Sequence, residues 1–501
     1  MGFLLDNKGF FLGIFSAFAI LILPTPESLS IEAHRTAALF LLMGIWWATE
    51  AVPVAVTALV PLALFPILGI VDIQDAANPY ANKTIYLFFG GFLIATAIQK
   101  WDLHKRIALF VLENAGSNGA SLVFGFMLTA ALISMWVMNT ATTIMLLPIG
   151  LAVVTVVKTT VKHLTDSEIE SFQLALLLGI AYGATIGGMS TLIGTGPNGM
   201  LAAFMADNYD LDISFVDWMK VGVPLSAVML PCSWLILTKI IFRVNFETSQ
   251  ETRELLSSMK EELGELKGPE LKVLIVFFLT AMAWMFRTVL DNFSALSGLS
   301  DAGIAMISAL FLFLLPSGNK EKKGALLEWK DAQENVPWGL LVLFGGGLSL
   351  ANAVQATGLA VWMGNLIPQG ISLALIIIMV VALIIFLTEL TSNMATTATF
   401  LPVVAAIAVQ SNFDPLLVTA AVALAASCAF MLPVATPPNA IVFGSGLIRV
   451  PQMARAGFLI NVLGIIVVSF VAVISVPYFL LLLPLARAPG LLESATPKIK
   501  S

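Results

Sequence analysis

Long hydrophobic stretches cover almost the whole chain, and short polar stretches separate them. A membrane-spanning helix needs about 20 predominantly apolar residues, and most of the stretches approach that length. The apolar stretches lie near residues 9–23, 36–49, 51–70, 84–99, 122–157, 172–193, 219–242, 271–290, 302–316, 338–353, 371–408, 415–432 and 456–484. No small-residue cleavage site follows the first one, so we expect it to be a membrane helix rather than a signal peptide.

Two of the stretches, residues 122–157 and 371–408, are too long for a single span. The same polar motif, Asn-x-Ala-Thr-Thr-x4-Pro, interrupts each of them near its centre, at residues 139–148 and 393–402. Polar groups at membrane depth are costly unless protein, ligand or ion satisfies them. We therefore expect two re-entrant helical hairpins, each of which returns to the side from which it entered, with the motif at its tip. The rest of the pattern predicts an all-α fold with about 11 transmembrane helices.

The repetition extends to both sides of the hairpins. A Gly-Gly helix precedes each one, since F-F-G-G-F-L-I-A-T-A-I-Q at residues 88–99 matches F-G-G-G-L-S-L-A-N-A-V-Q at residues 344–355. A helix broken by Thr-x-Pro-Asn follows each one, in I-G-T-G-P-N at 193–198 and V-A-T-P-P-N at 434–439. Such breaks unwind a helix and free backbone groups for coordination. We expect two inverted-topology repeats, as an odd number of crossings in each half requires, with a binding site at their interface.

Polar stretches divide the chain around these repeats. The main linker, residues 243–272, has the pattern of a short amphipathic helix at the membrane interface, ending at Gly268-Pro269. In the predicted division, N-terminal helices at 1–83 are followed by a first repeat at 84–242, which contains hairpin 122–157 and broken helix 172–206. The linker at 243–272 and further helices at 273–335 come next. The second repeat core at 336–455 contains hairpin 371–408 and broken helix 415–446, and a C-terminal helix and tail follow at 456–501.

Composition supports a multi-pass membrane protein and narrows the function. Charged residues make up 11% of the 501 residues and hydrophobic residues 58%, whereas soluble domains carry about 25% charged residues. A net charge of −6 suits no nucleic-acid partner, and two cysteines form neither a disulfide framework nor a metal cluster. No His-Glu cluster, Gly-x-Ser-x-Gly elbow or paired catalytic Asp motif lies at depth, so we do not expect an enzyme.

The polar residues expected at depth are nearly all neutral hydroxyls and amides, and no Lys or Arg lies in residues 122–157, 173–206, 371–408 or 415–448. Hydroxyls, Asn carbonyls and unwound backbone carbonyls suit a hard cation such as Na⁺. Free N–H groups at helix N-termini suit an anion. A cation beside each tip would supply the positive charge that no side chain provides, so the sequence favours coupled binding of cation and anion.

The same polar residues could instead have a purely structural role. Ser, Thr and Asn often join helices in membrane bundles, and Thr142, Thr143, Thr396 and Thr397 could cap the second helix of each hairpin. We favour ligand roles for the two tip asparagines, because each lies at the helix break of a repeated motif. For Glu389, an acid near the second tip, we favour a structural role as acceptor for backbone N–H groups, and for Glu50 that of a helix-end carboxylate.

These motifs resemble those of the divalent-anion:sodium symporter family, which includes sodium-coupled dicarboxylate, citrate and sulfate transporters. The most specific piece is S-C-A-F-M-L-P-V-A-T-P-P-N-A-I-V at residues 427–442, which is similar to the family's signature around its second broken helix. The two tips resemble the family's paired Ser-Asn-Thr motifs, and the resemblance covers nearly the whole chain. It implies one sodium ion between each tip and its facing broken helix, with the substrate carboxylates between the tips.

Carried over residue by residue, the resemblance implies three groups of ligands, several of them acting through backbone carbonyls. The first sodium site would comprise Ser134, Asn139 and Gly194, the second Thr388, Thr391, Asn393 and Ala435, and the anion site Asn139, Thr140, Thr195, Ser392, Asn393, Thr436 and Pro437. Two positions depart from the family pattern. Met138 replaces the usual Ser at the first tip, which removes a hydroxyl beside sodium. Met394 stands where the family often has Thr, which removes a substrate donor and adds bulk.

The resulting hypothesis is a sodium-coupled symporter of divalent organic anions, C4-dicarboxylates such as succinate, malate and fumarate, in the plasma membrane. The resemblance implies a homodimer in which scaffold helices, at residues 1–83 and 273–335, flank a transport domain that moves as an elevator. Three alternatives remain open, which are a sodium-independent dicarboxylate exchanger, a citrate or sulfate transporter of the same family, and an anion channel lined by the polar motifs.

Overall fold

The computed structural model describes residues 8–114, 116, 118–296, 298–318, 324–366 and 370–475. Within these ranges the regular structure is helical, and β pairing is limited to the isolated bridges Asn118–Glu247 and Pro316–Ala325. Eight helical stretches in the described ranges are long and apolar enough to cross a membrane, and six apolar helices are shorter. The prediction of an all-α membrane protein is therefore confirmed, while the number of about 11 transmembrane helices stays a prediction.

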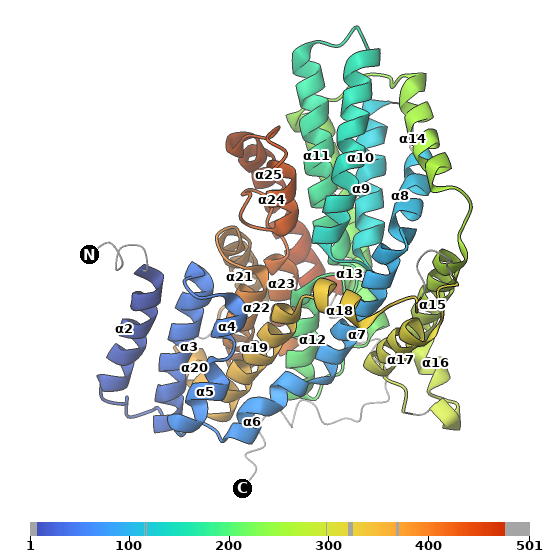
Figure 1. The fold of residues 1–501 in the computed structure, drawn as a ribbon. Coiled ribbons are helices and arrows are strands. Elements are labelled where there is room, and N and C mark those ends of the chain that lie inside the picture. Colours follow the sequence, from blue (N-terminus) through green and yellow to red (C-terminus); the bar gives the residue numbers. More distant parts are fainter. Residues whose placement is uncertain are drawn as a thin grey trace.

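The helices follow one another along the chain as Figure 1 shows. The N-terminal part contains α2 (Lys8–Ile22), α3 (Ile31–Thr49), α4 (Val54–Thr57), α5 (Val60–Ile67), α6 (Ile73–Ala77) and the 3-10 segment η1 (Asn78–Ala81). The next part contains α7 (Lys83–Lys100), α8 (Leu103–Glu113), α9 (Gly119–Ser134), α10 (Asn139–Thr160), α11 (Asp166–Gly188), α12 (Gly196–Tyr209), α13 (Phe215–Leu235) and the π segment η2 (Ile236–Ile241).

The middle of the chain contains α14 (Gln250–Leu263), α15 (Gly268–Met285), α16 (Arg287–Leu290), the 3-10 segment η3 (Ser294–Leu296), α17 (Asp301–Leu314) and α18 (Trp329–Asn335). The last part contains α19 (Trp338–Ala356), α20 (Leu359–Asn365), α21 (Leu373–Thr388), α22 (Asn393–Gln410), α23 (Pro415–Ala426), α24 (Pro437–Phe443), α25 (Val450–Phe470) and the π segment η4 (Val471–Ser475). The predicted C-terminal tail beyond residue 475 lies outside the described residues.

Both long apolar stretches fold as helical hairpins whose turns lie just before the repeated motif. Helices α9 and α10 are joined through residues 135–138, and α21 and α22 through residues 389–392. The second arm of each hairpin begins at the motif asparagine, Asn139 or Asn393. An asparagine at this position leaves the first-turn N–H groups of the helix pointing toward the tip.

The helix that follows each hairpin is broken, as the Thr-x-Pro-Asn motifs predict. In the first half α11 ends at Gly188 and α12 begins at Gly196, and in the second half α23 ends at Ala426 and α24 begins at Pro437. Proline in the first turn of α12 and of α24 is compatible with a helix start, because the N–H that it lacks would have no partner there.

The first hairpin packs closely on the first broken helix. Figure 1 shows α9, α10 and α11 as adjacent helices, and both arms contact α11. A methyl carbon at Gly183 would lie 2.6 Å from the backbone oxygen of Met127, and one at Gly187 would lie 2.2 Å from that of Ala131. Only glycine allows the backbones to approach this closely, as at other helix interfaces in membranes.

The two halves interlock at the centre of the molecule. Helix α10 of the first hairpin contacts α24 of the second broken helix, and α22 of the second hairpin contacts α12 of the first broken helix. Each second arm also contacts the broken helix of its own half, α11 or α23. The hairpins and helix breaks of both halves therefore meet in one region.

The predicted linker contains an amphipathic helix, α14, which ends at Leu263 before Gly264 rather than at Gly268-Pro269, where α15 begins. In α14 the side chains of Thr252 and Leu256 are buried, and the helix contacts α8 and α10. Its location at the membrane interface stays a prediction, as does the division of the chain into scaffold and transport domains.

Candidate binding site at the hairpin tips

The first hairpin tip joins its two arms through a side-chain hydrogen bond. Met138 takes an extended conformation before α10, with φ −51° and ψ 139°, so the chain turns and Asn139 starts the new helix. The hydroxyl of Ser134, at the end of α9, donates to Oδ1 of Asn139 over 2.5 Å. Ser134 is buried, whereas Asn139 and Thr140 are partly exposed.

The second tip reproduces this arrangement. The hydroxyl of Thr388, at the end of α21, lies 2.8 Å from Oδ1 of Asn393 and 3.1 Å from the carbonyl oxygen of Ala426. Thr388 is buried and Asn393 partly exposed, as at the first tip. The two repeated stretches thus form the same pair, in which a buried hydroxyl and an accessible amide present oxygen atoms side by side.

The expectation that threonines cap the second arms is wrong, because no side-chain cap hydrogen bond is present at the start of α10 or α22. Thr143 and Thr397 instead bond along their own helix. The hydroxyls of Thr143 and Thr397 donate to the backbone oxygens of Asn139 and Asn393, over 2.8 and 2.7 Å. Their bonds therefore run along the second arm, and they leave the first-turn N–H groups free for other partners.

The three residues predicted for the first sodium site lie close together. A methyl carbon at Gly188 would lie 2.6 Å from Oδ1 of Asn139 and 3.0 Å from the backbone oxygen of Gly194. These oxygens, with the Ser134 hydroxyl bonded to the same amide, therefore pack closely around Gly188, where a side chain would collide with them. Gly188, at the end of α11, was missed by the sequence analysis, although it belongs to a Gly187-Gly188 pair just before the break.

The residues predicted for the second sodium site are brought together only in part. Thr388 and Asn393 are paired, and Ala435 lies in the break before α24, where its N–H donates to the Leu432 oxygen over 3.2 Å. The hydroxyl of Thr391 instead donates to Leu387 O over 3.0 Å and lies 2.6 Å from Thr396 Oγ1. Thr391 therefore engages its own hairpin in this conformation rather than the asparagine.

The predicted anion ligands come from both tips and both breaks. Thr140, Thr195, Ser392 and the two tip asparagines are partly exposed, while Pro437 is exposed. Thr195 Oγ1 lies 3.5 Å from Ser427 Oγ, a contact that joins the two breaks. Thr436 is buried, and its hydroxyl accepts from the Asn439 N–H over 3.3 Å as a helix cap.

Met394 fills space between the halves. Its side chain is 6% exposed, and a methyl carbon at Gly196 would lie 2.1 Å from its sulfur. The thioether thus packs on the start of α12, next to Thr195. The bulk expected from the sequence lies between the second tip and the first helix break.

Glu389 binds the backbone of the second break, which confirms its predicted structural role. Its carboxylate accepts from the N–H groups of Phe430, Met431 and Leu432 at 2.8 to 3.1 Å, and from the Asn461 amide at 2.7 Å. Glu50, the other acid considered, is an exposed residue at the C-terminal end of α3, as expected.

In the first half, too, a side chain joins the hairpin tip to the helix break, but here the side chain belongs to the break. The hydroxyl of Thr191, in the first break, donates to the backbone oxygen of Met135 at the tip over 2.5 Å and accepts from the Gly194 N–H over 3.1 Å. Met135 precedes its tip asparagine by the same number of residues as Glu389 precedes Asn393. The side chain therefore comes from the break in one half and from the tip in the other.

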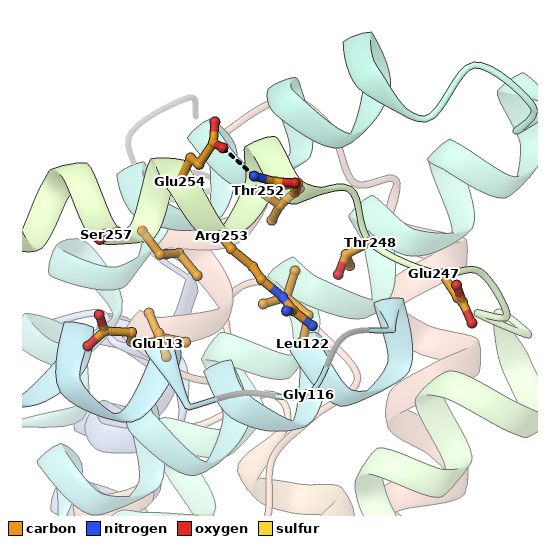
Figure 2. A pocket seen from close by; sticks show the side chains of 12 residues that line it. Glu113, Gly116, Leu122, Glu247, Thr248, Thr252, Arg253, Glu254 and Ser257 are labelled. Atoms are coloured by element: carbon orange, nitrogen blue, oxygen red, sulfur yellow. Dashed lines mark hydrogen bonds between the residues drawn. The ribbon is translucent and has the colours of Figure 1, made fainter.

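A cavity elsewhere in the molecule contains none of the predicted ligands. It measures about 760 Å³ and lies between the end of α8, the start of α9 and helix α14. Figure 2 shows Arg253 projecting into it, with Glu113 and Glu247 at its margin. A site there would use charged side chains, unlike the neutral tips.

Three comparisons place the chain among known proteins. Residues 7–483 match the model of a family described as the sodium:sulfate symporter transmembrane region. The chain is 39% identical over 474 residues to the sodium-dependent dicarboxylate transporter SdcS of Staphylococcus saprophyticus, covering 94% of this chain and 91% of that protein. It is 38% identical over 459 residues to SdcS of Staphylococcus aureus strain USA300, covering 91% of this chain and 88% of that one.

Among solved structures, MtrF of Neisseria gonorrhoeae, which represents a class of antimetabolite efflux pumps, has a similar fold. The TM-score is 0.53 with 12% sequence identity, over 93% of this chain and 94% of MtrF. At this identity the likeness concerns the fold alone.

Proposed function

The chain belongs to the sodium:sulfate symporter family, and we propose that it is a sodium-coupled secondary transporter of divalent organic anions. Its substrates would be C4-dicarboxylates such as succinate, malate and fumarate. Members of this family are transporters, so the chain is not an enzyme. The Staphylococcus relatives, named sodium-dependent dicarboxylate transporters, support dicarboxylates over sulfate.

The pair of matched tips is the observation that carries the proposal. Each tip offers an amide oxygen beside a hydroxyl oxygen, Asn139 with Ser134 and Asn393 with Thr388. Hard monovalent cations prefer such oxygen ligands, and unwound backbone carbonyls complete the shell in other transporters. Gly194 and Ala435 would supply those carbonyls, while Thr391 would contribute after rotating away from Thr396.

The anion would bind between the tips. The N–H groups at the starts of α10 and α22, the amides of Asn139 and Asn393 and the hydroxyls of Thr140 and Ser392 would meet its carboxylates. Thr195, Thr436 and Pro437 would line the same space from the breaks. Since no Lys or Arg lies in residues 122–157, 173–206, 371–408 or 415–448, the sodium ions would supply the positive charge and would bind first.

The proposal includes an elevator motion in a homodimer located in the plasma membrane. The hairpins and broken helices pack on each other across both halves, which supports their moving as one body. A carrier of this kind would expose the site to each side of the membrane in turn.

Transport into liposomes tests the proposal against its alternatives. Purified protein would be reconstituted and offered labelled succinate, citrate or sulfate, each with an inward gradient of Na⁺, K⁺ or protons. We expect concentrative succinate uptake with sodium alone. Equal uptake under all gradients would favour the exchanger, a preference for citrate or sulfate would change the substrate, and failure of counterflow would favour a channel.

A further inference from the structure

Asn198 and Asn439 are the last residues of the two Thr-x-Pro-Asn motifs, and none of the proposed ligand sets includes them. Each lies in the first turn of the helix after a break, α12 or α24. Both side chains are 0% exposed. A buried amide at the same place in both halves calls for a reason in the structure of the breaks.

In the first half the amide of Asn198 binds the chain that it follows. Its Nδ2 lies 2.7 Å from the carbonyl oxygen of Thr191, and 3.3 and 3.4 Å from those of Met189 and Gly188. The last carbonyls of a helix have no partner within the helix. Asn198, at the start of α12, therefore caps the end of α11 and ties the two ends of the break together.

In the second half Asn439 makes the corresponding bonds. Its Nδ2 donates to Leu432 O over 3.0 Å and to Ala429 O over 3.2 Å. The carbonyls lie 7 and 10 residues before the asparagine, as do those of Thr191 and Gly188 before Asn198. Glu389 meanwhile holds the N–H groups of residues 430–432, so this segment is fixed from both sides.

The carbonyls held by Asn198 adjoin the first proposed sodium site. A methyl carbon at Gly194 would lie 2.3 Å from the backbone oxygen of Gly188, and one at Gly188 would lie 2.6 Å from Oδ1 of Asn139. The end of α11, the Gly194 peptide and the tip amide are therefore in close contact. A shift of the break would move the Gly194 carbonyl relative to Asn139.

The side-chain amides of Asn198 and Asn439 form hydrogen bonds through their N–H groups only, among the described residues. Oδ1 of Asn198 and Oδ1 of Asn439 are buried, and neither has a hydrogen-bond partner in the part of the chain that the structure describes. A buried acceptor without a partner disfavours the folded state. In both halves the contacts of the amide are therefore those of its N–H groups with the carbonyls of the break.

We propose that Asn198 and Asn439 are positioning residues that set the sodium affinity of the first and second site. Each acts through the carbonyls of its helix break, which it holds so that Gly194 or Ala435 faces the ion. The inference rests on the proposed function, because it requires a sodium ion at each break. Groups that orient metal ligands in this way typically change affinity by about 10- to 100-fold when removed.

Sodium titration of two variants tests the inference. Asn198→Ala and Asn439→Ala would be reconstituted as full-length protein, and uptake of labelled succinate measured against sodium concentration. We expect the half-saturating sodium concentration to rise by about 10-fold in each variant, with uptake recovering at high sodium. Asn208→Ala is the matched control, since Asn208 in α12 donates to Phe204 O and Asn352 Oδ1 away from the break, and its titration should not change.

The outcomes separate this inference from the proposed function. If wild-type uptake depends on sodium and both variants titrate like wild type, the inference is wrong and the function stands, even if thermal stability falls. Wild-type uptake that ignores sodium overturns both. If only one variant folds, its sodium titration alone tests the inference. If neither folds, the two asparagines have a structural role and the inference is overturned.

Discussion

Each tip asparagine combines two chemical tasks in one side chain. Its oxygen accepts from Ser134 or Thr388 and can meet a cation, while its N–H₂ group can donate to a carboxylate. These pairs lie 5 residues apart in both halves, but Ser134 and Thr388 precede the repeated motif, so only the resemblance to the family pointed to them. Sequence reasoning identified the asparagines because they recur at a break in an apolar stretch.

Replacing either Asn139 or Asn393 by Ala should lower uptake by at least about 100-fold, because the ion loses an oxygen and the anion loses a donor. Labelled succinate uptake in liposomes is the measurement, and membrane expression of both variants should stay normal. Loss of expression would instead support a role in joining helices, and near-normal uptake would exclude the residue as an essential ligand.

Gly188 should tolerate no side chain, for a reason that only the three-dimensional structure reveals. An alanine methyl group would collide with the Asn139 amide, 2.6 Å from its Oδ1, and would displace that side chain, whereas the φ of Gly188 is not in the left-handed region and suits alanine. Gly188→Ala should therefore abolish sodium-dependent uptake without loss of folded protein. Gly268→Ala is the control, since nothing lies within 4 Å of the added carbon. A sodium titration of Gly188→Ala equal to that of wild type would contradict the proposed first site.

Met138 tests whether the missing hydroxyl of the first tip matters. The residue is partly exposed and precedes α10 in an extended conformation. Met138→Ser adds a hard oxygen, so the half-saturating sodium concentration should fall modestly, because backbone carbonyls already fill part of the shell. Uptake against sodium concentration measures it. An unchanged titration would mean that the serine caps α10 or that Met138 is a packing substitution that leaves the site intact.

At the scale of elements, the sequence predicted the hairpins and breaks well. Apart from the first broken helix, which begins at Asp166 rather than at 172, the helices begin and end within about three residues of the expected bounds, because apolar length and Pro, Gly and Asn signals are local. The fixation of each tip to its break was predictable only in part. Glu389 was recognisable as an acid in an apolar stretch. Thr191 was not recognisable, because it bonds the backbone carbonyl of Met135, which lies 56 residues away in the sequence.

Glu389→Gln should weaken the second break. A glutamine keeps the shape but turns an N–H₂ group toward the N–H groups of residues 430–432, which costs about 1–3 kcal/mol for a buried donor left without an acceptor. Thermal unfolding in detergent should show the loss, and the sodium titration should shift with it. Glu50→Gln, at an exposed helix end, is the control. Equal stability of the two variants would contradict the role of Glu389.

At the scale of the whole molecule, the two halves meet in one region because each hairpin contacts the other half's broken helix. Helix α10 reaches α24, and α22 reaches α12, where Met394 packs on Gly196. Sequence alone paired the motifs by similarity but could not show this exchange, since contacts between distant segments leave no local pattern. The proposed cation and anion positions lie where these segments meet, and residues 122–157, 173–206, 371–408 and 415–448 contain no Lys or Arg.

Equilibrium binding of labelled succinate to the purified protein tests this coupling most directly, because it needs neither a membrane gradient nor the proposed motion. We expect succinate to bind tightly in sodium buffer and its affinity to fall steeply as choline replaces sodium at constant ionic strength. The same succinate affinity in sodium and in choline would contradict the claim that sodium creates the anion site.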